Sequence, residues 1–190
     1  MSVHDLSALP ATTPDRDGAI RAVRDLLRAL GEDPDRDALV RTPERVADVF
    51  LDLFSGQHVD PATALGVPVA VADENPGELV SVVGIPFRSV CEHHLLPFEG
   101  TADVTYAPDR HIAGLSRIVR VVEIASRRPQ LQERLGQQIA DALMAGLAPR
   151  GVTVRLEARH GCVAHLEPAA AAARVITIAT AGDPPDLSRS

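Results

Sequence analysis

The chain has 190 residues, of which 45% are hydrophobic, and a formal net charge of -7. This length fits one ordinary domain with a short extension, and the hydrophobic share is enough to bury a core. Aromatic residues make up only 3% and Trp is missing, so a base-stacking surface for nucleic acid is not expected. The negative charge and the lack of a basic run also argue against nucleic acid and anionic membranes as partners.

No apolar run reaches the roughly 18 residues that a membrane-spanning helix needs. The polar N-terminus lacks the basic start and apolar stretch of a signal peptide, so we expect a cytoplasmic protein. Two cysteines in a reducing compartment rarely form a structural disulfide. Cys91 and Cys162 are therefore either buried thiols or ligands.

The N-terminal part is predicted to be a disordered tail, residues 1–17, followed by a helical extension, residues 18–56. Apolar residues recur at helical spacing from Ile20 to Leu30, and Gly31 ends that helix. Thr42 and Pro43 are typical of a second helix start, and that helix is expected to end by residue 56.

Residues 57–182 are predicted to form the main domain, and residues 183–190 a C-terminal tail. A loop over residues 57–77 precedes the regular elements. Periodicity and β-branched content predict strands at Leu79–Val83, Ile85–Val90, Thr101–Tyr106, Val152–Ala158 and Val175–Thr180, and helices at Leu115–Ala125 and 130–147. This order predicts an α+β fold in which helices back an antiparallel sheet.

Cysteine and histidine residues gather in two distant segments. Cys91 and His94 lie three apart after a predicted strand, and Cys162 follows His160 near the end of another. Thiolate and imidazole are ligands that zinc prefers, and three protein ligands leave a fourth position for water. A zinc ion lowers the pKa of such a water from about 15.7 to about 7, and the remaining histidines would then serve as acid and base.

The same residues also fit a second interpretation, and spacing alone does not separate the two. Both cysteines would then be small buried hydrophobic residues, and the histidines would be hydrogen-bonded or surface groups.

The sequence resembles the GTP cyclohydrolase I family over roughly residues 20–182. The resemblance rests on these segments: Thr42-Pro43-Glu44-Arg45, Cys91-Glu92-His93-His94, Gly114-Leu115-Ser116-Arg117, Arg128-Pro129-Gln130-Leu131-Gln132-Glu133-Arg134-Leu135 and His160-Gly161-Cys162. It implies a tunnelling fold and a toroidal homodecamer with active sites between subunits.

The resemblance also implies roles for single residues. Zinc would be held by Cys91, His94 and Cys162, and the proton-transfer histidines would be His93 and His160. The purine anchor would be Glu133 with Gln132 beside it, and the ribose-phosphate side of the substrate would meet Ser116, Arg117 and Arg120. A carboxylate accepts two parallel hydrogen bonds from the N1–H and the 2-amino group of guanine, which adenine does not offer. Without the resemblance, Glu133 would be taken for an exposed helix carboxylate and Ser116 for a helix cap.

The implied reaction is zinc-dependent hydrolysis of the imidazole ring of GTP at C8, which releases formate and forms 7,8-dihydroneopterin triphosphate. The chain departs from the family at Leu166 and Glu167, where the family carries Arg-Gly and the Arg binds the triphosphate. Each lost charge-assisted hydrogen bond costs on the order of 1.5–3 kcal/mol. Compensating arginines such as Arg88 or Arg174 would keep GTP as substrate.

Three other interpretations stay open on the sequence. One is a paralogue that opens a less phosphorylated purine nucleotide or nucleoside in a specialised pathway. Another is a purine or pterin binder without turnover, which the intact histidines and metal ligands argue against. A purely structural protein is the third class, and it predicts that no metal is bound.

Overall fold

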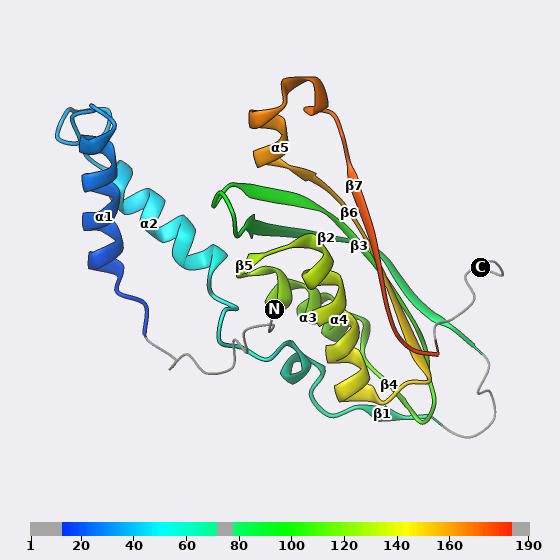
Figure 1. Cartoon of the computed structure of the whole chain (residues 1–190). Coiled ribbons are helices and arrows are strands. Elements are labelled where there is room, and N and C mark those ends of the chain that lie inside the picture. Colours follow the sequence, from blue (N-terminus) through cyan, green and yellow to red (C-terminus); the bar gives the residue numbers. More distant parts are fainter. Residues whose placement is uncertain (1–12, 72–77, 184–190) are drawn as a thin grey trace, which may run out of the picture. The chain divides into compact units, whose positions relative to one another are not determined.

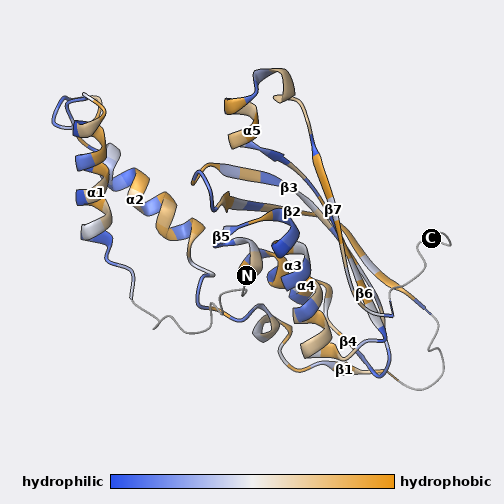
Figure 2. Ribbon diagram, in the orientation of Figure 1, coloured by the Kyte–Doolittle hydropathy of each residue, from blue (hydrophilic) through white to orange (hydrophobic). Residues whose placement is uncertain are grey.

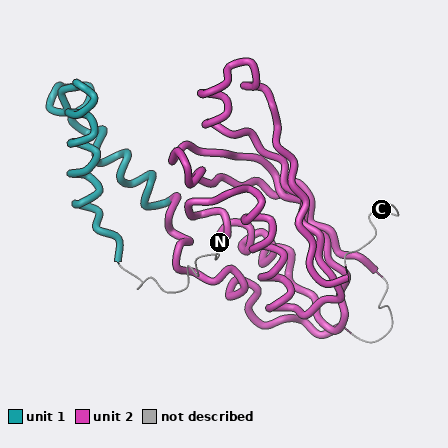
Figure 3. The backbone as a smooth tube through the Cα atoms, viewed as in Figure 1, with its two compact units in different colours: residues 1–52 teal, residues 53–190 magenta. Residues whose placement is uncertain are grey.

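The computed structural model describes residues 13–71 and 78–183. Most of the two predicted tails therefore lies outside the described residues. The chain divides into two compact units, residues 1–52 and 53–190 (Figure 3). The boundary after residue 56, at the glycine expected to end the second helix, stays a prediction.

The first unit contains α1 (Arg16–Ala29) and most of α2 (Thr42–Leu53). The Asp15 carboxylate caps α1 by accepting a hydrogen bond from the Gly18 amide at 2.8 Å. Because of this cap, α1 begins two residues inside the stretch that was predicted to be disordered. Apolar spacing, on which the prediction relied, carries no information about the polar first turn of a helix.

The second unit has the predicted α+β architecture. Its main sheet has the strand order β5-β2-β3-β6-β7, in which the four long strands pair antiparallel. The strands are β2 (Val80–Cys91), β3 (Pro97–Ala107), β5 (Pro129–Gln130), β6 (Gly151–His160) and β7 (Val175–Gly182). The long helices are α3 (Leu115–Ser126) and α4 (Gln132–Leu147). The short elements are η2 (Pro61–Leu65), β1 (Val69–Ala70), β4 (His111–Ile112), α5 (Gly161–Leu166) and η3 (Pro168–Ala170).

The two extended segments predicted on either side of residue 84 are one strand, β2. Its pairing with β3 shifts between Val82 and Ile85, where Gly84 has a φ of +70°. That conformation is strained for any residue with a side chain, so glycine permits the irregularity. The Gly84 amide donates a hydrogen bond to Asp103 Oδ1 at 2.8 Å, which holds the irregular position against β3.

One face of the sheet packs against α3 and α4, which lie beside each other in Figure 1. Fully buried side chains on this inner face include Phe98, Val104 and Leu156, and α3 and α4 contribute aliphatic residues such as Ile118 and Leu143. The core is therefore mainly aliphatic, as the low aromatic content predicted.

The opposite, outer face of the sheet carries charged side chains. Arg155 of β6 bridges Asp103 of the neighbouring strand β3 and Glu157 of its own strand, at 3.3 and 2.8 Å. Hydrophobic residues run along much of β7 (Figure 2), and Ile176 and Ile178 are 53% and 66% exposed. Within the described residues, no helix has the length and apolar character to cross a membrane.

A half-buried arginine, Arg128, fixes the chain between α2 and η2 onto the end of α3. The Arg128 guanidinium donates hydrogen bonds to the carbonyl oxygens of Gly56, Val59 and Ile124. Burial lowers the pKa of Arg128, and the Asp60 carboxylate partly opposes that shift. The guanidinium thus adds a side-chain donor to these carbonyl groups, of which those of Gly56 and Ile124 also accept hydrogen bonds from backbone amides.

We predict that Arg128→Met lowers the free energy of unfolding by about 1–3 kcal/mol, because it removes the donor shared by these carbonyls. Urea unfolding followed by circular dichroism measures this loss. Arg110→Met, at an exposed position, is the matched control and should change the free energy by less than about 0.5 kcal/mol. Equal stability of the two variants would contradict the assigned role of Arg128.

Candidate metal centre

The turn between β2 and β3 brings residues 91 and 94 to one side of the chain. The Cys91 amide donates to the Leu96 carbonyl, and the Leu95 amide donates to the Cys91 carbonyl, both at 2.9 Å. Leu95 has a left-handed φ of 53°, which is uncommon for a residue with a branched side chain. These bonds close a tight turn whose shape the sequence spacing had only suggested.

The second segment of the centre enters from β6. His160 is the last residue of β6, and Cys162 lies in the first turn of α5. A Cβ atom at Gly161 would lie 2.8 Å from the Pro97 carbonyl oxygen, which is closer than real contacts allow. Glycine at this position therefore permits the start of α5 to approach the start of β3 and the turn beside it.

The structure brings Cys91, His94 and Cys162 together. Their ligand atoms all lie within 4.8 Å of one another, and Cys91 Sγ lies 3.8 Å from His94 Nδ1. Three ligands of a tetrahedral zinc ion, with bonds of about 2.0–2.3 Å, would be separated by roughly 3.5–3.8 Å. Small side-chain shifts are enough to reach that geometry, so the donor set fits one metal ion.

The two thiols are buried, and His94 is exposed. Cys91 and Cys162 are 6% and 7% exposed, and both are free. Burial raises the pKa of the Cys162 thiol, and the neighbouring Cys91 adds to the rise. Two thiolates at this separation are costly without a cation, and a bound divalent ion reverses that balance.

His160 lies beside this cluster with its ring held on two sides. His160 Nε2 is 2.7 Å from Gln132 Oε1, and the ring stacks on Phe98 with centroids 4.6 Å apart and an interplanar angle of 5°. Burial lowers the pKa of His160, while the charge of Glu133 acts in the opposite direction. Burial therefore favours the neutral imidazole, which is the form that accepts a proton.

His93 occupies a different environment, because its side chain is 62% exposed. Its neighbour Glu92 forms a two-pronged ion pair with Arg134 of α4, with nitrogen–oxygen distances of 2.5 and 3.0 Å. The Arg134 guanidinium holds the pKa of Glu92 below its ordinary value, chiefly through the hydrogen bond. This ion pair joins the turn that carries two of the clustered ligand atoms to the first turns of α4.

Glu133 and Gln132, adjacent in sequence, have opposite placements. Glu133 is exposed in the first turn of α4, a helix that begins without a side-chain cap. The sequence analysis placed Gln132 beside Glu133 as part of the purine anchor. Its side chain is 1% exposed and is hydrogen-bonded inside the protein, and its part in purine binding stays a prediction.

The residues expected at the ribose-phosphate side lie on α3. Ser116, Arg117 and Arg120 are exposed, and Arg120 pairs with Glu123 at 2.6 Å. Within residues 13–71 and 78–183, no hydrogen bond or ion pair joins them to the metal cluster. The single chain therefore does not assemble the complete predicted set of site residues by direct contact.

The position where the family's phosphate-binding arginine was expected is apolar and open. Leu166 is 64% exposed at the end of α5, and Glu167 beside it is also exposed. The two arginines considered as replacements are each paired on the outer face, Arg88 with Glu99 at 3.0 Å and Arg174 with Glu157 at 2.8 Å.

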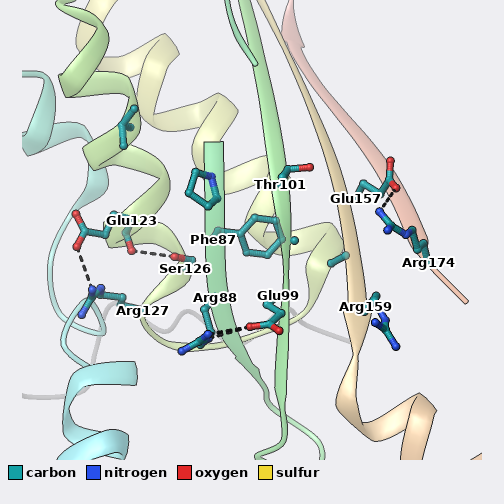
Figure 4. Close-up of a pocket in the computed structure, with 14 residues that line it drawn as sticks. Phe87, Arg88, Glu99, Thr101, Glu123, Ser126, Arg127, Glu157, Arg159 and Arg174 are labelled. Atoms are coloured by element: carbon teal, nitrogen blue, oxygen red, sulfur yellow. Dashed lines mark hydrogen bonds and ion pairs between the residues drawn. The ribbon is translucent and has the colours of Figure 1, made fainter. Parts of the chain in front are cut away.

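A cavity of about 630 Å³ includes these pairs in its lining, along with Arg127 and Glu123 of α3 (Figure 4). Arg159 also lines it, whereas the next residue along β6 is His160. The cluster residues Cys91, His94 and Cys162 and the His160 side chain are not among its lining residues. The cavity is therefore separate from the metal cluster.

Three residues that shape the site were not predicted from the sequence. Phe98 stacks on His160, and the Glu92–Arg134 pair fixes the turn. The motif segments contain Glu92 and Arg134, but no local pattern predicts that they meet. The alternation of β3 gave a signal for Phe98 as an inward residue, without indicating its partner.

The sequence matches the model of the family described as GTP cyclohydrolase I over residues 19–187. A protein named GTP cyclohydrolase 1 from Mycobacterium tuberculosis H37Rv is 52% identical over 152 residues, 79% of this chain and 74% of its own length. Another of that name from Leifsonia xyli subsp. xyli is 48% identical over 162 residues, 85% of this chain and 84% of its own.

Among solved structures, the archaeosine synthase QueF-Like in the apo form matches with 19% identity and a TM-score of 0.48. That match covers 57% of this chain and 98% of the other. The family assignment rests on the sequence matches, which cover most of the chain. The chain belongs to the GTP cyclohydrolase I family, and with it to the metal-dependent enzymes of the tunnelling fold.

Proposed function

We propose that this protein hydrolyses the imidazole ring of GTP at C8, releases formate and forms 7,8-dihydroneopterin triphosphate. Membership of the family and relatives named GTP cyclohydrolase 1 at about half identity support this activity. The observation that carries it is the Cys91–His94–Cys162 cluster with a histidine two residues from one of its thiols.

The proposed metal is zinc, held by the two thiolates and the His94 imidazole. When bound in a three-ligand site, zinc binds and polarises water and lowers its pKa to about 7. The protein's part is to exclude bulk water from the thiols, which are almost completely buried, and to leave the exposed His94 side of the cluster accessible.

We assign the proton transfers to His160 and His93. The burial and stacking of His160 keep its ring in one orientation and favour its neutral form, so it is suited to take up a proton at neutral pH. The exposed ring of His93 is suited to exchange protons with the substrate. The Glu92–Arg134 ion pair keeps the backbone beside His93 in place.

Guanine recognition is assigned to the Glu133 carboxylate. It stands in the exposed first turn of α4, where the first amide N–H groups of the helix have no intrahelical acceptor. A carboxylate accepts hydrogen bonds from guanine N1–H and the 2-amino group, and adenine lacks this pair of donors. The position therefore selects guanine over adenine.

The phosphate groups are assigned to Ser116, Arg117 and Arg120 on the exposed side of α3. Arg117 supplies a fixed positive charge at the position where the family has Lys. Leu166 and Glu167 add no positive charge, which had suggested a less phosphorylated substrate as the alternative. Relatives named for GTP cyclohydrolase 1 activity do not favour that alternative.

We further propose that the protein is cytoplasmic and works as a homo-oligomer with sites shared between subunits, in the decameric form implied by the family resemblance. Free Cys91 and Cys162 suit a reducing compartment. The separation of the α3 residues from the metal cluster in one chain agrees with a site that a second subunit completes.

The metal assignment predicts that the purified protein carries about one zinc ion per chain, because the cluster offers three ligands of the preferred types. The His94→Ala and Cys162→Ser variants should each lose most of the bound zinc, as measured by elemental analysis. His58→Ala, at an exposed histidine outside the cluster, should keep its full metal content. Loss of metal in this control, or retention in both cluster variants, would contradict the assignment.

The guanine assignment predicts that Glu133→Gln lowers kcat/KM for GTP by about 10- to 150-fold. The amide loses one charge-assisted hydrogen bond, worth about 1.5–3 kcal/mol. Release of formate from GTP gives the rates. Glu44→Gln makes the same change in the first turn of α2, at an exposed residue, and should leave the rate unchanged. A Glu133→Gln variant as active as this control would rule out the anchor.

The phosphate assignment predicts that kcat/KM for GTP exceeds that for GMP, because three phosphate groups meet more of the positive charge on α3. Steady-state formate release from both nucleotides makes the comparison. Arg117→Met should reduce the difference in kcat/KM between GTP and GMP, because it lowers kcat/KM for GTP more than kcat/KM for GMP. Equal values for GTP and GMP in the unaltered protein would favour the less phosphorylated substrate instead.

A further inference from the structure

The side-chain amide of Gln132 has one orientation that its surroundings accept. Gln132 Nε2 lies 3.3 Å from the Leu156 carbonyl oxygen and 3.0 Å from the Val175 carbonyl oxygen. It also lies 3.2 Å from Thr177 Oγ1. An amide turned by 180° would set its oxygen against two carbonyl oxygens inside the core, where the side chain is 1% exposed. The NH₂ group therefore faces the sheet, and Gln132 Oε1 faces His160.

This orientation determines which nitrogen of His160 carries hydrogen. Gln132 Oε1 is an acceptor only, and it lies 2.7 Å from His160 Nε2. His160 Nε2 must then be the donor, which leaves Nδ1 as the nitrogen with a free lone pair in the neutral ring. Among the described residues, no hydrogen bond to His160 Nδ1 is found.

We propose that Gln132 is a positioning residue for His160, which fixes the ring with hydrogen on Nε2 and presents Nδ1 for the proton transfer. This inference rests on the proposed function for the identity of the reaction, and on the amide geometry for the placement of the proton. Gln132 thereby acts through His160, and its side chain does not contact the purine.

The arrangement keeps its geometry when a proton arrives. An Nε2–H group donates to the Gln132 oxygen whether Nδ1 is bare or protonated, so the hydrogen bond is present before and after the transfer. The stacked Phe98 ring, parallel to within 5°, prevents the imidazole from tilting out of that line. The ring thus needs no reorganisation during the step.

Solid-state ¹⁵N NMR of the zinc-loaded protein, labelled at histidine, tests the inference without any substrate and for any size of assembly. His160→Asn identifies the signals of the ring by their loss. The expected result is a proton bonded to Nε2 of His160 at neutral pH. A bare Nε2 with the proton on Nδ1 would overturn the proposal, even in a protein that turns over GTP.

Kinetics of Gln132→Met separate positioning from substrate binding. The variant fills the same space without the acceptor, and we expect kcat for GTP to fall by at least about tenfold while KM changes little. Gln137→Met changes an exposed glutamine of the same helix and should match the unaltered protein. A raised KM with unchanged kcat would show that Gln132 binds substrate, and would overturn the proposal.

Failure of the proposed function has a different signature. A protein that releases no formate from GTP, yet carries its proton on His160 Nε2, would refute the assigned reaction and leave the placement of the proton standing. Should Gln132→Met fail to fold, the NMR result on the unaltered protein still decides the inference.

Discussion

The antiparallel register between β3 and β6 is the constraint on which the metal centre depends. It sets Phe98 opposite His160, and the pairing of Val90 with Pro97 sets the end of β2 beside them. Side chains alternate between faces along a strand, so a slip of one residue would turn His160 to the outer face. The same slip would also move Cys162, which follows directly in α5, away from Cys91. The register is fixed by the buried residues farther along β3 and β6, such as Val104 opposite Val154.

The two faces of the sheet divide the chemistry between them. The inner face carries the core, and at the end of the strands it continues into the thiol cluster and the stacked His160. The outer face carries paired charges, and the arginines that line the cavity of Figure 4 each have a carboxylate or backbone partner. A paired arginine offers less to a phosphate than a free one, because the anion must displace the carboxylate. The cavity therefore does not coincide with the proposed metal site.

Much of the fold can be predicted from local sequence. The elements that were not predicted have physical causes. The long strands and α3 and α4 were predicted because their apolar residues recur at periods of two or 3.6. The two-residue strand β5 was missed, since Pro129 is typical of a break and its pairing with β2 is a tertiary event. The helix α5 was missed for a related reason: its six residues include one buried side chain, Cys162, and therefore show no amphipathic period.

The site was predicted less completely than the fold. Metal-ligand types at the right spacing indicated Cys91, His94 and Cys162, but only the structure shows that the ligand atoms lie within 4.8 Å. The burial of Gln132 could not be predicted from the sequence, because a glutamine next to a glutamate is typical of the protein surface. It is buried because α4 begins against β6 and β7, and their carbonyl groups receive its amide.

Burial links metal retention to proton handling in this protein. Burial raises the pKa of the Cys162 thiol, and a bound cation would compensate the charge of its thiolate, so metal binding would favour ionisation of this thiol. The backbone that brings Cys162 to the proposed metal site also carries His160, two residues earlier, onto Phe98 and Gln132. A disturbance of the β3–β6 ladder would therefore change ion binding and the orientation of His160 at once. A change confined to the Gln132 amide would alter the orientation of His160 alone, because none of the three proposed metal-ligand atoms contacts this amide.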